Sequence, residues 1–422
     1  MIFRRPTYYD KFKCTADKCS DSCCIGWEID IDSTTADYYS RVGGAFGERL
    51  RNCISGGSFV LGENERCPFL NVRNLCDIYT TLGEEHLCQI CSDHPRFYEW
   101  FGAVKDGGLG LCCEAAAQLI LTEDFALTES VIDEPEEETP TLYPLLSEAR
   151  EQIISHLMSD PFSEAICAAL GFCEELQEIL DSGGEIWLPE WGKYQPTPQR
   201  PDTAAITEFF ADLEPIDDDW RPYIERCAKL PEMPLGSITE KQEFLRRIAV
   251  YYVYRFFMKS VFDGDVLGRM KLAAVCTWFI ARLWFCGDGD FTEMAETAKN
   301  FSKEVEYSEE NLDSLADAFY FDDIFTTSRI AGLFTKSSMI LQLEMPLIVM
   351  SGIRLGYVLF QFRGILTSAE KTSPSMLTRN SPPQASVKLR AIESPRPLPS
   401  EVLSSSPRTN LSVISSAENF IS

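Results

Sequence analysis

The sequence predicts a mainly α-helical protein with an irregular, cysteine-rich, metal-binding N-terminal domain, an all-α domain and a disordered tail. Three observations support this fold class. Eleven of the sixteen cysteines lie within the first 113 residues, apolar segments with helical spacing fill the middle of the chain, and Ser, Thr and Pro supply 25 of the last 56 residues. With 45% hydrophobic residues among 422, the chain is long enough for more than one domain.

Charge divides the chain in a similar way. The net charge is −5 for residues 1–122, −26 for 123–330 and +4 for 331–422. The segment Glu134–Pro140 is acidic and contains two prolines, which is typical of a solvated linker. The sequence therefore predicts a cysteine-rich metal or iron–sulfur domain over 1–122, an acidic linker over 123–143, an α-helical domain over 144–334, and an atypical Ser/Pro-rich tail over 335–422 that is disordered or foreign.

Hydrophobic spacing predicts where the helices lie. Spacings near 3.6 residues predict helices at about 144–158, 161–181, 203–213, 239–262, 266–285 and 290–303. The aromatic residues of 241–262 are predicted to be core rather than a cofactor site. Before residue 123, short alternating pieces such as Trp27–Asp32 suggest strand edges. Segments 266–285 and 339–366 are interrupted by charges, so neither is predicted to cross a membrane.

Composition excludes some classes of function. A formal charge of −27 disfavours binding to nucleic acid or to an anionic membrane, and it suits a partner that presents lysines. The first ten residues, MIFRRPTYYD, lack the apolar region of a secretory signal, so a cytoplasmic protein is predicted. In a reducing cytosol, clustered cysteines are expected to hold metal rather than to form disulfides.

Ten N-terminal cysteines form the clearest motif. Gathered thiolates bind zinc or iron–sulfur clusters. The adjacent pairs Cys23-Cys24 and Cys112-Cys113 depart from zinc-finger spacing, which favours an iron–sulfur cluster, although zinc remains the alternative. One cubane cluster needs four ligands. The remaining cysteines are then available for a second metal site or as redox-active thiols such as Cys91 and Cys113. The candidate metal ligands, of which a subset is needed, are Cys14, Cys19, Cys23, Cys24, Cys67, Cys76, Cys88, Cys91, Cys112 and Cys113.

Three further polar side chains lie within this motif. His86 and His94 are candidates for metal ligands or for residues that support the ligands. Arg96 is a candidate for holding a cofactor carboxylate with two hydrogen bonds. Its alternative role is an ion pair with Asp93 or Glu99, and the sequence slightly favours that alternative.

Several motifs together carry a family resemblance. The chain resembles the flagellin lysine-N-methylase (FliB-like) family most specifically over residues 1–122 and more weakly to about Phe334. The N-terminal part is also similar to small iron–sulfur or zinc-binding cysteine cluster proteins. The motifs are Tyr8–Cys14, Cys23–Asp30, Arg66–Leu70, Leu75–Tyr79, His94–Phe97 and, in the helical part, Glu306–Leu312.

The resemblance implies a protein lysine N-methylase. Such an enzyme would transfer methyl groups from S-adenosylmethionine to surface lysines of flagellin, with a cysteine-bound iron–sulfur cluster, expected to be 4Fe-4S. The amine must lose its proton before it accepts the methyl group. Glu28, Asp30, Tyr98 and Glu99 are candidate bases of the right type, and Arg96 is the candidate cofactor-binding residue.

Common adenosylmethionine signatures are missing from the sequence. Gly107-Gly108-Leu109-Gly110 leads into Cys112-Cys113 rather than into a nucleotide-binding helix, and no C-x3-C-x2-C motif occurs. A non-catalytic metal-binding adaptor or chaperone with structural zinc is therefore the alternative reading. The sequence does not indicate which lysines are modified, to what degree, or the oligomeric state.

Overall fold

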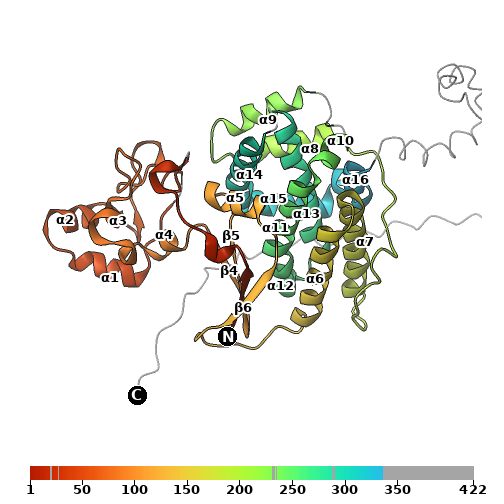
Figure 1. Cartoon of the computed structure of the whole chain (residues 1–422), viewed down its shortest axis with the longest axis horizontal. Helices are drawn as coiled ribbons and strands as arrows, with labels where there is room; N and C mark the ends of the chain where they lie inside the picture. Colours follow the sequence, from red (N-terminus) through yellow and green to blue (C-terminus); the bar gives the residue numbers. More distant parts are fainter. Residues whose placement is uncertain (20, 27, 231–232, 234, 288–289, 336–422) are drawn as a thin grey trace, which may run out of the picture. The chain divides into compact units, whose positions relative to one another are not determined.

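The computed structural model describes residues 1–335 except 20, 27, 231–232, 234 and 288–289. This part of the chain is mostly helical, as predicted, and also contains a four-stranded sheet. Apart from Thr335, the predicted tail lies outside the described residues. Figure 1 shows the order of the elements along the chain.

Five of the six predicted helices of the middle region agree with the structure to within a few residues. The predicted helix over 239–262 is divided into shorter helices, and the helices over 220–228, 309–321 and 327–333 were not predicted. Side-chain caps mark the start of several of the observed helices. Asp202, Asp265, Asp290 and Ser308 each accept a hydrogen bond from a backbone N–H in the first turn of the helix that follows. The helices are α6 (Tyr143–Ser159), α7 (Phe162–Asp181), α8 (Thr203–Asp212), α9 (Trp220–Ala228), α10 (Leu235–Glu240), α11 (Gln242–Phe256), α12 (Ser260–Asp263), α13 (Val266–Phe285), α14 (Phe291–Glu306), α15 (Glu309–Phe321) and α16 (Thr327–Leu333).

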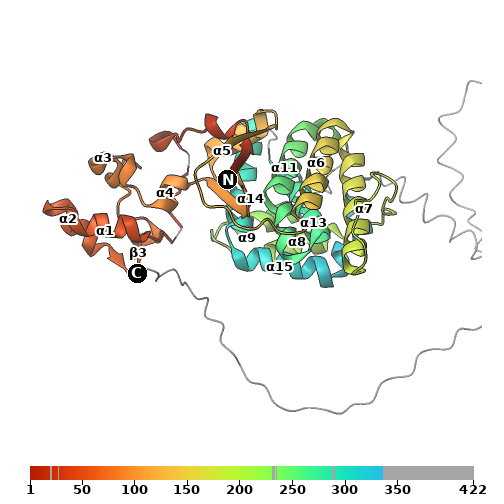
Figure 2. The ribbon, with the colours of Figure 1, turned by 90° about the horizontal axis from the view of Figure 1, so that it is seen from below.

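Helix α13 is the centre of the helical region. It packs against α7, α11, α14 and α15, and Figure 2 shows α6, α11 and α13 running side by side. Sixteen of its twenty residues are buried, including the charged residues Lys271 and Arg282, which interrupt the apolar sequence. Lys271 donates to the Phe319 carbonyl at 2.7 Å, and Arg282 donates to the Cys227 carbonyl at 2.8 Å. These bonds stabilise both cations inside the core.

The four-stranded sheet combines a strand from the start of the N-terminal region with three strands from its end. Its strands are β1 (Ile2–Pro6), β4 (Arg96–Phe101), β5 (Val104–Leu109) and β6 (Leu127–Val131), in the order β4-β5-β1-β6. Strand β1 runs parallel to β5 and antiparallel to β6, and β4 is antiparallel to β5. The expectation of an irregular N-terminal region was therefore incomplete, since these strands pair over distances that local spacing does not report.

Residues 13–95, here called the cysteine lobe, lie between β1 and β4 in the chain. The lobe has its own small core, which includes Ile29, Tyr39, Phe59 and Phe69. Where a strand was suggested near Ile29, the described residues form isolated bridges, Ile25 with Arg66 and Asp30 with Ser58. The lobe's short elements are α1 (Ser33–Arg41), α2 (Gly44–Asn52), β2 (Ile54–Ser55), β3 (Ser58–Phe59), α3 (Asp77–Leu82) and α4 (Gln89–Asp93).

The larger hydrophobic core crosses the predicted boundary at residue 122. It contains Tyr8, Phe101, Leu109 and the buried face of α5 (Glu114–Thr122) together with the helices from α6 onward. In the segment predicted as a linker, Glu134 binds Lys105 and Glu136 binds the N-terminal amine at 2.8 Å. Among the described residues, no helix has the length and apolar character needed to cross a membrane.

Candidate functional site

The sheet register brings three cysteine-bearing stretches of chain to one end of the sheet. Strand β1 ends at Pro6, β4 begins at Arg96 and β5 ends at Leu109, and the pairings Arg96↔Leu109 and Arg4↔Asp106 place these ends together. The lobe therefore leaves and re-enters the sheet at the end where Cys112 and Cys113 follow β5. Distant cysteines thus come near one another through strand pairing.

Five lobe cysteines form what we call the first thiol group: Cys24, Cys67, Cys76, Cys88 and Cys91. The Sγ atoms of Cys88 and Cys91 are 3.3 Å apart, and the Cys67 amide donates to the Cys24 carbonyl at 2.8 Å. The pKa of Cys67 is raised to about 12, mainly by burial, and the nearby thiols of Cys24 and Cys76 contribute to the rise. Burial also raises the pKa of Cys76, with Cys24 contributing. These thiols are close enough to influence one another's ionisation.

The other five predicted ligands form the second thiol group: Cys14, Cys19, Cys23, Cys112 and Cys113. Burial raises the pKa of Cys113 to about 11, and the thiols of Cys19 and Cys14 add to the rise. The pKa of Cys23 is also raised, mainly by a hydrogen bond with its neighbour Cys24 and more weakly by the thiols of Cys14 and Cys113. The structure thus sorts the ten predicted ligands into two neighbourhoods, which meet at Cys23 and Cys24.

The described residues hold no group of three or more His, Cys, Asp or Glu side chains arranged to bind a metal ion. The donor chemistry nevertheless suits a soft metal or an iron–sulfur cluster, because buried, neighbouring thiols are the ligands that such groups require. The ten cysteines stay predicted ligands on that chemical argument.

The turn that carries Cys112 and Cys113 is fixed by a buried polar cluster, here called the Glu306 junction. Glu306, whose side chain is fully buried, accepts hydrogen bonds from Tyr251 at 2.6 Å, Tyr252 at 2.8 Å and Arg255 at 2.8 Å. The Tyr251 hydroxyl also accepts from the Leu111 amide at 3.2 Å. The charges of Arg255 and Glu306 compensate each other, so neither charge is left unpaired in the interior.

Tyr307 completes this junction beside the cysteines. The Arg255 guanidinium lies 5.0 Å from the Tyr307 ring centroid. Burial raises the pKa of Cys112 to about 12, while a hydrogen bond with Tyr307 and the charge of Arg255 oppose that rise. Sequence reasoning missed this cluster because it read the tyrosines of 241–262 as core. The signal available was Glu306-Tyr307 itself, which stood among the family motifs.

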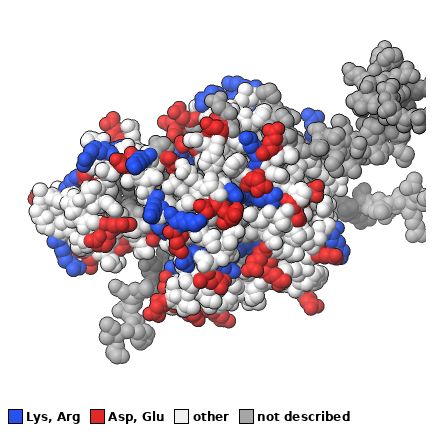
Figure 3. Space-filling model, in the orientation of Figure 1, with Lys and Arg blue, Asp and Glu red and all other residues white. Residues whose placement is uncertain are grey.

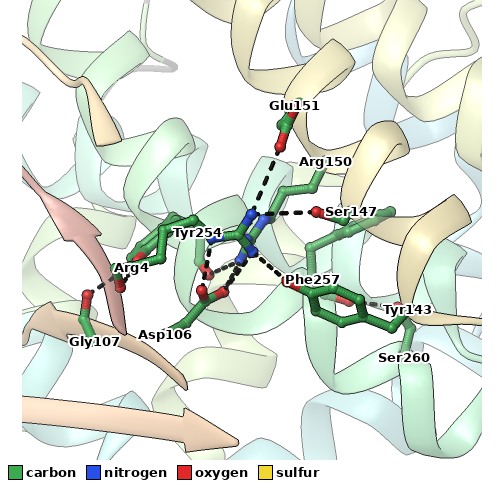
Figure 4. Close-up of polar contacts among 10 residues, drawn as sticks. All are labelled: Arg4, Asp106, Gly107, Tyr143, Ser147, Arg150, Glu151, Tyr254, Phe257 and Ser260. Carbon is green, nitrogen blue, oxygen red and sulfur yellow. Dashed lines mark hydrogen bonds and ion pairs between the residues drawn. The ribbon is translucent and has the colours of Figure 1, made fainter. Parts of the chain in front are cut away.

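A second buried cluster anchors the sheet to the helices (Figure 4). Asp106 on β5 accepts from Arg4 on β1 at 2.8 Å and from Arg150 on α6 at 2.7 Å. Burial alone would raise the pKa of Asp106, but Arg150 and Arg4 together lower it below its usual range. Tyr254 on α11 donates to the carbonyls of Arg4 at 3.2 Å and Gly107 at 3.0 Å. This cluster fixes the strand that leads to Cys112.

The lobe is also tied to helix α14. Asp21 accepts from Lys303 at 2.6 Å and lies 3.6 Å from the Lys299 ammonium. His94 is close to the same region, since burial and the charge of Lys303 lower its pKa to about 4. His94 is therefore neutral at pH 7, which is the state a metal ligand needs. His86, by contrast, stacks on the Tyr38 ring at a centroid distance of 4.1 Å.

The candidate bases are not brought together. Glu28 and Asp30 are exposed, and Asp30 accepts from Ser58 at 2.6 Å. Glu99 pairs with Lys259 at 3.0 Å, and the Tyr98 hydroxyl is 2.9 Å from that of Tyr9. Their catalytic role stays a prediction that the structure does not test.

Among the described residues, Arg96 forms no ion pair with Asp93 or Glu99, and its role in holding a cofactor carboxylate stays a prediction. Its guanidinium lies 5.1 Å from the Phe12 ring centroid and 5.5 Å from that of Tyr9. It also donates to the Ser92 carbonyl at 3.5 Å. The aromatic contacts follow from the register, which starts β4 beside the end of β1.

Comparison with known proteins identifies related sequences. Residues 204–333 match the model of the FliB lysine N-methylase C-terminal domain. The chain is 27% identical over 154 residues to a lysine-N-methylase of Salmonella typhimurium strain LT2, covering 33% of this chain and 38% of that protein. The same figures hold for a lysine-N-methylase of Salmonella choleraesuis. It is 28% identical over 135 residues to the flagellar biosynthetic protein FliU of Salmonella muenchen, covering 29% of this chain and 78% of that protein.

These matches confirm the family resemblance. The range matched by the domain model is the helical part, from α8 to α16, and includes Glu306 and Tyr307. The chain spans less than half the length of the two lysine-N-methylases. No solved structure matches.

Proposed function

Because this chain is FliB-like over residues 204–333, we propose that it is a protein lysine N-methylase that acts on surface lysines of flagellin. The match to the FliB lysine N-methylase C-terminal domain carries the proposal. The names of the Salmonella relatives, two lysine-N-methylases and one flagellar biosynthetic protein, support the reaction and the flagellar context.

The proposed methyl donor is S-adenosylmethionine. In the reaction, the lone pair of a neutral lysine ε-amine forms a bond to the methyl carbon while the methyl–sulfur bond breaks. S-adenosylhomocysteine leaves, and the proton of the amine passes to a base or to solvent. The chain's task is then to hold a lysine in its neutral form and in line with the sulfonium methyl group.

The proposed metal cofactor is an iron–sulfur cluster held by a subset of the ten predicted cysteines. The first thiol group is the better candidate, because Cys67 and Cys88 are buried and Cys88 and Cys91 are in contact. When bound, a cluster would supply thiolate-held iron that can accept and release an electron. The Glu306 junction would fix Cys112 and Cys113 against the helical region, whichever metal is present.

The partner is proposed to be a folded protein that presents lysines. On the face seen in Figure 3, carboxylates are spread over the surface with basic side chains between them. The excess of acidic residues, −27 overall, favours encounters with a basic surface patch.

The test is a methylation assay with flagellin and methyl-labelled S-adenosylmethionine, using the full chain purified and reconstituted without oxygen. We expect label on flagellin lysines, and metal analysis should find iron with acid-labile sulfide. The proposal is wrong if the reconstituted chain leaves flagellin unlabelled. Zinc without sulfide, and no transfer, would favour the adaptor with structural zinc.

Matched cysteine variants separate ligands from ordinary core residues. Cys67→Ala removes a member of the first thiol group, while Cys53→Ala removes a half-buried cysteine of the same lobe that is outside the predicted ligand set. We expect Cys67→Ala to lower iron content and methyl transfer at least tenfold, in line with the loss of a metal ligand. Cys53→Ala should stay within about twofold of the unmodified chain. Equal effects of both would contradict the assignment of Cys67.

A further inference from the structure

One lysine of this chain lies inside a box of aromatic rings. The ammonium nitrogen of Lys105 is 4.7 Å from the ring centroid of Tyr98, 4.8 Å from that of Trp100 and 5.9 Å from that of Phe3. Glu134 closes the box with a carboxylate oxygen 2.7 Å from the same nitrogen. We call Phe3, Tyr98, Trp100 and Glu134 the ammonium box.

The strand register builds the box. Lys105 on β5 pairs directly with Phe3 on β1 and with Trp100 on β4, so one ring stands on each side of it. Tyr98 is two residues from Trp100 and so projects from the same face of the sheet. The next residues along, Arg4 and Asp106, point to the opposite face and enter the buried cluster of Figure 4.

Glu134 is held in place by the box itself. Its second carboxylate oxygen is 3.4 Å from the Trp100 indole nitrogen, which donates to it. The hydrogen bond from Lys105 is the main reason that the pKa of Glu134 is lowered. The carboxylate therefore stays charged and faces the centre of the box at neutral pH.

This chemistry is specific for one kind of group. Several aromatic faces around a single cation, with a carboxylate at the rim, recognise an ammonium, and the rings bind its methylated forms by the same attraction. An ordinary lysine of this chain is different: Lys259 pairs with Glu99 at 3.0 Å but has a single ring, Phe256, at 5.9 Å. The ion pair with Glu134 does not require aromatic neighbours, so the three rings around Lys105 indicate a site shaped for an ammonium group.

The box is open to solvent on one side. Trp100 is 49% exposed and the Glu134 side chain 38%, whereas Lys105 itself is only 13% exposed. The ammonium of Lys105 fills the interior while two walls reach the surface. Because a lysine stem is flexible, this occupant can leave without any change in the strands.

We propose that the ammonium box is a recognition site for the lysine or methyllysine side chain of a partner protein, and that Lys105 is a built-in occupant that the incoming side chain displaces. The inference rests on the proposed lysine methylase function for the identity of the partner. The recognition of an ammonium rests on the contacts of Lys105 alone.

The test uses a small probe, the amide of Nα-acetyl-Nε-trimethyllysine, and needs no methyl transfer. Binding is followed by ligand-observed NMR, since rings that surround the N-methyl protons shift their resonance upfield. In the full chain, Lys105→Ala should lower the probe's Kd about tenfold by vacating the box. Lys259→Ala, the matched control, should bind as the unmodified chain does. Lys105→Ala combined with Tyr98→Ala should lose the gain.

Two results would overturn the inference: no gain in affinity for Lys105→Ala with native circular dichroism, or an equal gain for Lys259→Ala. If the double variant unfolds, Lys105→Ala combined with Tyr98→Leu gives the same comparison with less loss of packing. Because the readout is binding, its failure leaves the methylase proposal untouched. Conversely, failure to methylate flagellin leaves the box testable.

Discussion

Asp106 is the single residue on which the anchoring of the sheet depends most. Its side chain is 3% exposed and pairs with both Arg4 and Arg150, whereas Glu151, the other carboxylate drawn in Figure 4, lies 3.6 Å from Arg4 and is 62% exposed. We expect Asp106→Asn to lower the free energy of unfolding by about 3–5 kcal/mol, because the buried Arg150 loses its paired carboxylate and the buried Arg4 keeps only the exposed Glu151. Urea denaturation followed by circular dichroism measures this.

The control for that experiment is a neighbouring ion pair at the surface. Asp10 is 61% exposed and binds Arg5 at 2.9 Å. Asp10→Asn should change stability by about 0–1 kcal/mol, because water screens the pair. A cost as large as that of Asp106→Asn would mean that burial is not what makes the Asp106 cluster important.

Gly110 is required by the close approach of Tyr307. A Cβ atom there would lie 2.4 Å from the Tyr307 hydroxyl and 3.3 Å from the Cys112 Sγ. Gly110→Ala should therefore displace the turn and lower both stability, by about 1–3 kcal/mol, and the metal content of the reconstituted chain. Gly184→Ala, whose nearest neighbour would be 3.5 Å away, should change neither. Normal metal loading in Gly110→Ala would contradict the role given to the turn.

For individual residues, the sequence predicted which types of side chain form the candidate site better than it predicted their contacts. Its ten cysteine ligands fall into two spatial neighbourhoods, which spacing along the chain did not indicate, since Cys113 joins Cys14 and Cys23. The ion pair of Arg96 with Asp93 or Glu99, favoured from the sequence, is not formed, and the guanidinium lies near the rings of Tyr9 and Phe12 instead. Such contacts depend on strand pairing across about a hundred residues of chain.

Among the elements, helix α14 carries a carboxyl group with a raised pKa. Glu304 is 4% exposed and accepts from the amides of Ile216 at 2.8 Å and Asp217 at 3.0 Å. Burial raises its pKa from 4.5 to about 7 despite these bonds. The folded state therefore binds this proton more tightly than the unfolded state does.

Stability from Glu304 is fully present below about pH 4.5 and is lost as the pH rises through about 7, with a slope of at most ~1.4 kcal/mol per pH unit. Glu304→Gln should flatten this part of the profile, measured by urea denaturation at several pH values. The exposed Glu309→Gln should leave the profile as it is. Equal profiles for the unmodified chain and Glu304→Gln would rule out this titration.

The helices could be predicted from sequence, and the sheet could not. Segments such as Val266–Phe285 can be predicted from apolar residues at helical spacing after a capping aspartate. Strand β1 reads Ile-Phe-Arg-Arg-Pro and β5 reads Val-Lys-Asp-Gly-Gly-Leu, so neither shows apolar alternation. Their charged residues are inside because each finds an opposite charge on another element, which periodicity cannot reveal.

For the whole molecule, the predicted domain limits can be tested by truncation. A fragment of residues 144–335 would keep the helices from α6 onward. It would lose the strands that contact α6 through Asp106 and α11 through Arg4. It would leave Arg150, which is fully buried, without its carboxylate. We expect this fragment to unfold at lower urea concentration and less cooperatively than residues 1–335. Equal stability of both fragments would support an independent domain that begins at 144.

The cysteine lobe is an insertion between β1 and β4, two strands of one sheet. Its two ends leave the sheet on the same side, separated by one intervening strand, or about 10 Å. A bridge of a few residues can span that gap, so the lobe is a cassette within a continuous scaffold. A graft at these two junctions would carry the whole first thiol group to another protein, whereas the second group would be left incomplete, since Cys112 and Cys113 follow β5.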